Sequence, residues 1–108
     1  MREPISPGKP FNAKESIAYA EGSVVSKTLI KKPTGTLTLF SFDAGEGLSE
    51  HSSPHEALVQ VLEGSVEITI GGESTVVTEG ESLILPANIP HALKAVERFK
   101  MLLTMIKS

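Results

Sequence analysis

The sequence contains no cysteine among its 108 residues. That absence excludes disulfide bonds, thiolate metal sites and cysteine nucleophiles together. No apolar run approaches the ~20 residues of a membrane span, and the N-terminus, Met1-Arg2-Glu3-Pro4, is followed by polar residues instead of the apolar core of a signal peptide. We therefore expect a cytoplasmic protein that is neither inserted into a membrane nor exported.

The sequence also has no long run of residues that carry charge of one sign. Ten basic and thirteen acidic residues are scattered along the chain and give a formal net charge of −3. No basic stripe is available to neutralise a run of phosphates, so we expect no nucleic-acid partner. The chain also has no nucleotide-binding glycine loop, no serine-hydrolase elbow and no HExxH motif, so those enzyme classes find no support.

The length and composition fit one domain, because 108 residues with 40% hydrophobic content supply one core. Residues 1–22 contain Pro4, Pro7, Gly8 and Pro10, which interrupt regular pairing, and we interpret this stretch as an N-terminal arm. Within it, residues 12–20 are expected to form a helical turn capped by Asn12. Residues 23–108 then form the single folded domain.

The pattern after residue 22 is typical of β-strands. Apolar Val66, Ile68 and Ile70 alternate with polar residues, which predicts one buried and one solvated face. Glycine-containing turns separate such segments every 8 to 12 residues or so. The expected strands are 24–31, 36–42, 58–62, 65–70, 74–78, 82–85, 91–96 and 99–106.

The last expected strand, 99–106, is apolar on both faces. A barrel of this size has only one interior, so the outer face of this strand needs a second covering. We expect a homodimer in which another subunit supplies it. The alternative is that the N-terminal arm folds back over the same face.

Two segments carry a specific spacing of glycine, proline and histidine. In the first, Gly45 is followed by five residues and then His51, and the segment ends at Gly64. The second segment contains, in order, Gly80, Pro86, Asn88, His91 and Ala95. This spacing resembles the two signature motifs of the cupin superfamily, with Asn88 at a glycine position. Asn is the residue other than glycine that most readily adopts the left-handed backbone conformation. The resemblance implies an all-β fold, a double-stranded β-helix with a jelly-roll-like barrel, which the remaining strand pattern also fits.

The resemblance further implies a divalent metal held by two histidines and a glutamate of the first motif and one histidine of the second. Here only His51 and His91 match, because Ser53 and Ala57 stand at the other two ligand positions. His55 is a possible substitute, since alternation in an extended segment points it to the same side as His51. A site of three histidines would suit Fe, Zn, Ni, Cu or Mn.

Two features limit the metal interpretation. Pro54 precedes His55 and can turn its ring towards solvent. His51 and His91 can also be polar groups that line a wet cavity without any metal. If a metal is bound, Glu50, Glu56 and Gln60 are nearby acceptors for the second ring nitrogens.

A small-molecule pocket is expected inside the barrel. Its predicted lining combines short polar and apolar side chains, namely Ser53, Ala57, Val59, Gln60, Val61, Phe42, Leu85 and Met101. No residue is assigned a catalytic role, and nothing in the sequence names a substrate.

Two classes of function fit this pocket. By resemblance, a metal-dependent enzyme would act on a small organic molecule as a dioxygenase, isomerase or decarboxylase. Alternatively, the barrel binds or senses a small apolar or weakly acidic molecule without metal or chemistry. A metal-free epimerase ranks lower, because its acid would be a tyrosine and the only tyrosine, Tyr19, lies in the arm.

Overall fold

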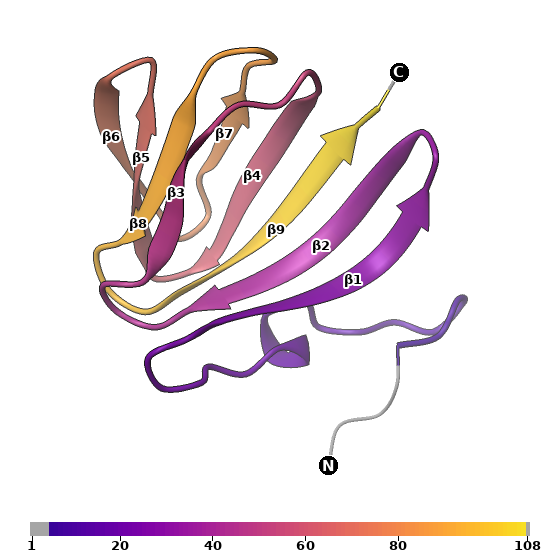
Figure 1. Cartoon of the computed structure of the whole chain (residues 1–108). Coiled ribbons are helices and arrows are strands. Elements are labelled where there is room, and N and C mark those ends of the chain that lie inside the picture. Colours follow the sequence, from indigo (N-terminus) through magenta and orange to yellow (C-terminus); the bar gives the residue numbers. More distant parts are fainter. Residues whose placement is uncertain (1–4, 108) are drawn as a thin grey trace.

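Segments of alternating apolar and polar residues pair into two antiparallel sheets that face each other (Figure 1). The structure is a computed structural model and describes residues 5–107. The strands are β1 (Val24–Lys32), β2 (Gly35–Phe42), β3 (Gly47–His51), β4 (Glu56–Glu63), β5 (Ser65–Ile70), β6 (Glu73–Thr78), β7 (Ser82–Leu85), β8 (His91–Ala95) and β9 (Phe99–Ile106).

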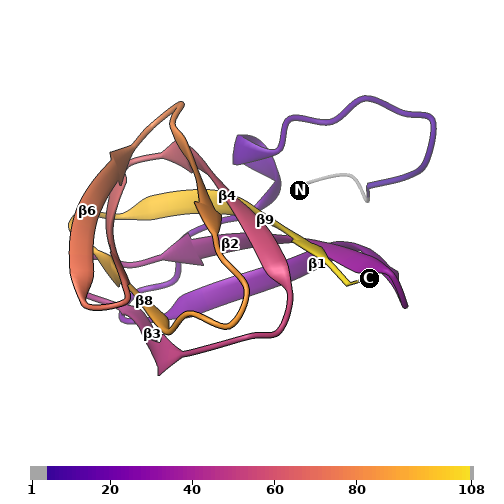
Figure 2. The same ribbon diagram turned by 90° about the horizontal axis from the view of Figure 1, so that it is seen from above.

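The larger sheet has the strand order β1-β2-β9-β4-β7 and the smaller one the order β3-β8-β5-β6. Seen from above, the two sheets curve around a common interior (Figure 2). This arrangement confirms the expected all-β double-stranded β-helix. The expected strands 65–70, 82–85 and 99–106 have the observed bounds, whereas β3 (Gly47–His51) was not predicted.

The core fills the space between the inner faces of the sheets. Phe42 of β2 and Phe99 of β9 are fully buried register partners, and their rings stack with centroids 4.4 Å apart. Aliphatic side chains from both sheets complete the core: Ala57, Val59, Val61, Val66, Ile68, Val77, Leu85, Leu93, Ala95 and Met101. Stacked aromatic pairs of this kind add about 0.5–1.5 kcal/mol to the burial of their area.

The N-terminal arm packs on the outer face of the larger sheet. Its expected helical turn is shorter than predicted, a 3-10 helix at Lys14–Ser16, and the Glu15 amide donates to Asn12 Oδ1 at 3.1 Å. Ile17 is 4% exposed, and Ser41 Oγ on β2 donates to the Ala18 carbonyl at 2.8 Å. The arm therefore covers part of the outer face, which is one of the two coverings that the sequence predicted.

No helix within residues 5–107 is long and apolar enough to cross a membrane.

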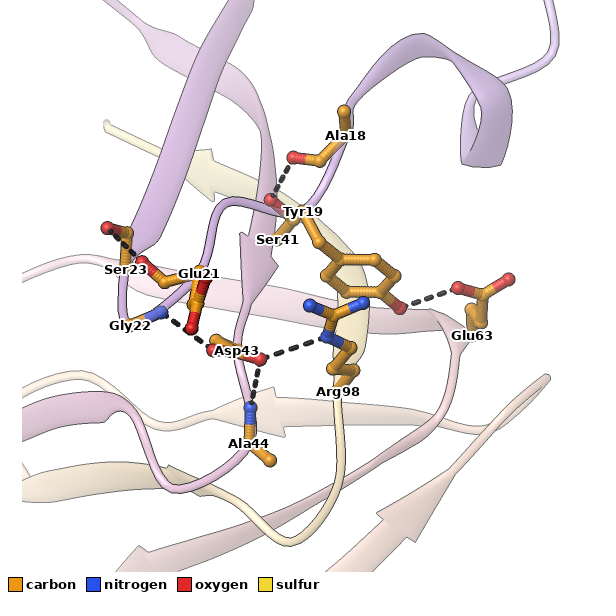
Figure 3. Close-up of polar contacts among 10 residues, drawn as sticks. All are labelled: Ala18, Tyr19, Glu21, Gly22, Ser23, Ser41, Asp43, Ala44, Glu63 and Arg98. Atoms are coloured by element: carbon orange, nitrogen blue, oxygen red, sulfur yellow. Dashed lines mark hydrogen bonds and ion pairs between the residues drawn. The ribbon is translucent and has the colours of Figure 1, made fainter.

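Tyr19 fastens the end of the arm to the barrel (Figure 3). Its hydroxyl donates to the Glu63 carboxylate at 2.5 Å, and the Arg98 guanidinium lies 5.0 Å from the centre of its ring. Arg98 Nε in turn donates to Asp43 at 2.9 Å, and Asp43 also accepts from the Gly22 amide at 2.7 Å. Burial, and then the bond to Glu63, raise the pKa of Tyr19 well above its usual value. Tyr19 thus holds the arm in place and does not line the cavity described below.

Candidate functional site

A tight turn after β7 (Ser82–Leu85) positions one wall of the candidate site. Asn88 in this turn has a φ of 65°, which confirms the left-handed conformation inferred from its place in the motif. The Asn88 amide donates to the Ser53 carbonyl at 2.7 Å. This bond ties the turn to the segment between His51 and His55, so both motifs meet at one end of the barrel.

His51 and His91 are brought together by the pairing of β3 with β8. The two residues are register partners, and their ring centroids lie 4.4 Å apart in an edge-to-face arrangement. Gly47 permits this pairing, because a Cβ there would lie 2.1 Å from the Leu93 carbonyl oxygen. His91 is 6% exposed and His51 is exposed, so the pair extends from the interior to solvent.

Hydrogen bonds to the backbone orient both imidazoles. Nδ1 of His51 lies 2.8 Å from the Ser49 carbonyl oxygen, and Nδ1 of His91 lies 3.3 Å from the Ile89 carbonyl oxygen. A carbonyl oxygen only accepts, so each Nδ1 must carry the hydrogen. In the neutral ring, Nε2 is then an acceptor with a free lone pair. Backbone carbonyls thus accept these bonds in place of the predicted acceptors Glu50, Glu56 and Gln60.

The charge state of His91 follows from its surroundings. Burial lowers the pKa of His91 below its usual range, the neighbouring His51 lowers it further, and the bond to the Ile89 carbonyl partly opposes this. The neutral form is therefore favoured at neutral pH. His91 presents an unprotonated Nε2 under these conditions.

The two rings border a cavity of about 50 Å³ inside the barrel. All three histidines of the sequence line it, together with Ser53, Ala57, Leu85 and Met101 from the predicted pocket. Leu48, Leu93, Leu103 and Met105 complete the wall. The cavity therefore has an apolar body and a polar end made by the histidines.

Some predicted pocket residues lie elsewhere. Val59, Val61 and Phe42 are on the inner faces but belong to the packed core, away from the lining of this cavity. Gln60 has the opposite orientation in β4, in register with Ser82 and Leu102.

Three further residues border the cavity although none of them was predicted to line it: Leu48, Leu93 and Leu103. A signal for one of them was present, since Leu93 follows His91 by two residues and shares its face.

The histidines do not form a complete set of metal ligands. Within residues 5–107 no group of three or more His, Cys, Asp or Glu side chains is placed to hold a metal ion. His51 and His91 have suitable Nε2 atoms, and His55 borders the same cavity without completing the set. The three-histidine metal site therefore stays a prediction.

A second, larger hollow of about 480 Å³ adjoins the cavity on the outside of the larger sheet. It shares His55 and Ala57 with the inner cavity. Its other lining residues are Pro54, Glu56, Leu58, Ile84, Ala87, Thr104 and Ile106.

The chain resembles known proteins in both sequence and structure. The sequence profile of the Cupin domain family matches residues 38–107. A conserved protein of unknown function from Streptococcus pyogenes has a TM-score of 0.92 and 39% identity, covering 96% of this chain and 91% of that one. A cupin superfamily protein from Desulfitobacterium hafniense has a TM-score of 0.90 and 28% identity, covering 96% and 95% of the two chains.

Two further matches cover a smaller part of the relative. A Cupin 2 conserved barrel domain protein from Leptotrichia buccalis is 47% identical with a TM-score of 0.87, over 90% of this chain and 47% of that one. A mannose-1-phosphate guanylyltransferase from Salmonella montevideo is 28% identical over 101 residues, which are 93% of this chain but 19% of that enzyme.

Proposed function

The chain belongs to the cupin family, and from that premise we propose that its barrel binds a small, weakly acidic hydroxyl compound, such as a phenol, at His51 and His91. Binding in this proposal needs neither metal nor catalysis. The observation that carries it is the orientation of the two rings: both Nδ1 atoms face backbone carbonyls, which leaves both Nε2 atoms to meet a ligand.

The chemistry of these atoms selects the ligand. When the imidazole is neutral and Nδ1 carries the hydrogen, Nε2 has a lone pair that accepts a hydrogen bond and cannot donate one. A hydroxyl group supplies the missing donor, whereas a carboxylate would bring further lone pairs against them. The leucine and methionine walls favour an apolar body behind that hydroxyl.

The size of the cavity limits what enters it. About 50 Å³ accommodates roughly one or two water-sized groups. We therefore expect the hydroxyl end of the ligand to reach His91 and the adjoining part of its apolar body to contact the leucine and methionine walls, while the remainder lies towards the solvent-exposed His51.

A titration of the protein with matched aromatic probes tests this proposal. Phenol is expected to shift the methyl resonances of Met101 and Met105, whereas anisole, which lacks the donor, binds about tenfold more weakly. In His91→Phe the two probes should bind alike, and Ser74→Ala on the outer face of the smaller sheet serves as the control. Equal binding of phenol and anisole by the natural protein, or tighter binding of benzoate, would contradict the proposal.

A metal-dependent enzyme is the second candidate, because His51, His55 and His91 all border one cavity. By family resemblance it would be a dioxygenase, isomerase or decarboxylase, and its metal would act as a Lewis acid. The His55 ring would have to join the other two. Metal analysis of protein purified without tag or chelator separates the candidates: about one Fe, Zn, Ni, Cu or Mn per chain, lost in His51→Ala and His91→Ala, would favour the enzyme.

The guanylyltransferase activity of the Salmonella relative is not proposed for this chain, because the match covers 19% of that enzyme.

A further inference from the structure

The inner face of the larger sheet continues past the histidine cavity to the edge strand β1. One line of register partners on this face runs from Leu85 through Ala57, Met105 and Thr36 to Lys31. Register partners of an antiparallel pair share one face of the sheet, and Leu85, Ala57 and Met105 line the cavity. Lys31 therefore lies on the same face as the cavity lining, two strand spacings or about 10 Å from Met105.

Lys31 differs in charge from the other residues of this face. Within the described part of the chain, it is the only charged residue among those that register places on the inner face of the five strands. Lys32, the next residue, pairs with Gly35 and faces the opposite side of the sheet. Arg98 and Asp43 form the only ion pair within residues 5–107, so Lys31 has no carboxylate partner among them.

The inner face of β1 is open to solvent. Thr28 and Lys31 on this face are exposed, and Thr36 and Thr38 on the neighbouring β2 are half-buried. Figure 2 shows β1 and β3, which are edge strands of the two sheets, on the same flank of the molecule. The exposed His51 is the last residue of β3. A ligand that extends from the cavity past His51 therefore meets the inner face of β1.

The residues between the cavity and the edge of the sheet supply hydrogen-bond donors for an anionic group. The lysine ammonium of Lys31 has a positive charge and three donors, and the hydroxyl of its partner Thr36 adds one more. Thr38 carries a second hydroxyl beside Leu103, which lines the cavity. One positive charge matches a carboxylate, whereas a phosphate monoester has a charge of about −1.5 to −2. These residues therefore favour a carboxylate.

The histidines and Lys31 favour different groups of one ligand. Nε2 of His51 and of His91 accepts a hydrogen bond, which favours a hydroxyl and disfavours a carboxylate, whose oxygens only accept. The ammonium of Lys31 only donates, so it favours the carboxylate. Apolar side chains line the cavity between the two ends, and they favour an aromatic ring. The ligand is thereby held in one orientation, with its hydroxyl inside and its carboxylate at the edge of the sheet.

We propose that the ligand of this barrel is a hydroxyaryl carboxylate, which binds with its hydroxyl at His51 and His91 and its carboxylate at Lys31. This inference rests on the hydroxyl-binding site proposed above and adds the anionic end of the ligand. Lys31 thus determines specificity for an acid over its neutral analogue. Because Lys31 is exposed, its ion pair should tighten binding only about twofold to fivefold.

A titration with 4-hydroxyphenylacetate and 4-hydroxyphenylacetamide, followed by the methyl resonances of Met101 and Met105, tests the role of Lys31. The two compounds share the ring and the hydroxyl and differ in charge at the other end. The natural protein should bind the acid about twofold to fivefold more tightly, and added salt should reduce the difference. Lys31→Gln should bind both compounds alike, and Lys31→Glu should bind the amide more tightly than the acid.

Lys32→Gln is the matched control, because Lys32 is exposed and charged like Lys31 but lies on the outer face of the sheet. This variant should keep the preference for the acid. Equal binding of acid and amide by the natural protein, or loss of the preference in Lys32→Gln as well, would overturn the assignment to Lys31 and leave the hydroxyl site standing. If neither compound binds, the hydroxyl site is wrong and the assignment to Lys31 falls with it.

Discussion

Replacing Ala57 by glutamate should create a metal site in this barrel. Ala57 is 6% exposed, pairs with Leu85 and Met105, and borders the cavity that all three histidines share. It also stands at the motif position where the family resemblance places a glutamate ligand. A carboxylate there would join His51 and His91, and hard and borderline divalent ions such as Zn²⁺ accept such a mixed set.

The size of the effect follows from the burial of the new carboxylate. Without metal, a buried acidic group that lacks a partner costs about 2–4 kcal/mol, and its pKa rises so that it takes up a proton. For a domain of this length the melting temperature should fall by roughly 10–30 °C. Zinc at a hundred times its dissociation constant should then restore about 2.7 kcal/mol, because it binds only the folded form.

Thermal unfolding with and without Zn²⁺ measures both effects, and Val59→Glu is the matched control. Val59 is fully buried two residues further along the same face of β4, but it lies outside the lining of the histidine cavity. Its variant should lose stability without recovery by zinc. If Ala57→Glu also fails to recover, or if Val59→Glu recovers equally, the assignment of Ala57 to the histidine cavity is refuted.

Two further predictions concern the turns and the arm. Asn88→Ala should cost about 1–2 kcal/mol in chemical denaturation, since its φ is 65°, while Asn88→Gly should cost little or nothing; equal losses would contradict the conformational argument. Hydrogen bonds from Gly22, Arg98 and Ala44, in that order, lower the pKa of Asp43 below its usual 3.8, so its stabilising effect is present above that pH and is lost as the pH falls through the lowered pKa. Asp43→Asn should therefore flatten the dependence of stability on pH below about pH 4, and an unchanged acid profile would count against this role.

Most of the strands could be predicted from the sequence because their apolar residues alternate and their turns contain glycine. β3 was missed because Gly47, Ser49 and Glu50 leave Leu48 as its only apolar residue. That strand is held by its pairing with β8, which the sequence does not reveal.

The sequence predicted the histidines of the candidate site but not the orientation of their rings. The motif spacing indicated His51 and His91, and both line one cavity with His55. The orientation of the rings could not be predicted, because it depends on the carbonyl oxygens of Ser49 and Ile89. Every residue has a backbone carbonyl, so the sequence does not indicate which carbonyl accepts the bond.

The covering of the outer face was left open between the arm and a second subunit. Ile17 and the bonds of Ser41 and Lys100 now assign one half to the arm.

The most direct test of the proposed ligand site is a long-range ¹H–¹⁵N correlation spectrum of the histidine side chains near neutral pH. It reports which ring nitrogen carries the hydrogen. We expect His51 and His91 to have a protonated Nδ1 and an unprotonated Nε2, and the Nε2 resonances to move when phenol is added. The proposal that these two atoms accept the hydrogen bond of the ligand hydroxyl would be contradicted by protonated Nε2 atoms in both rings. Nε2 resonances that do not move at saturating phenol would contradict it equally.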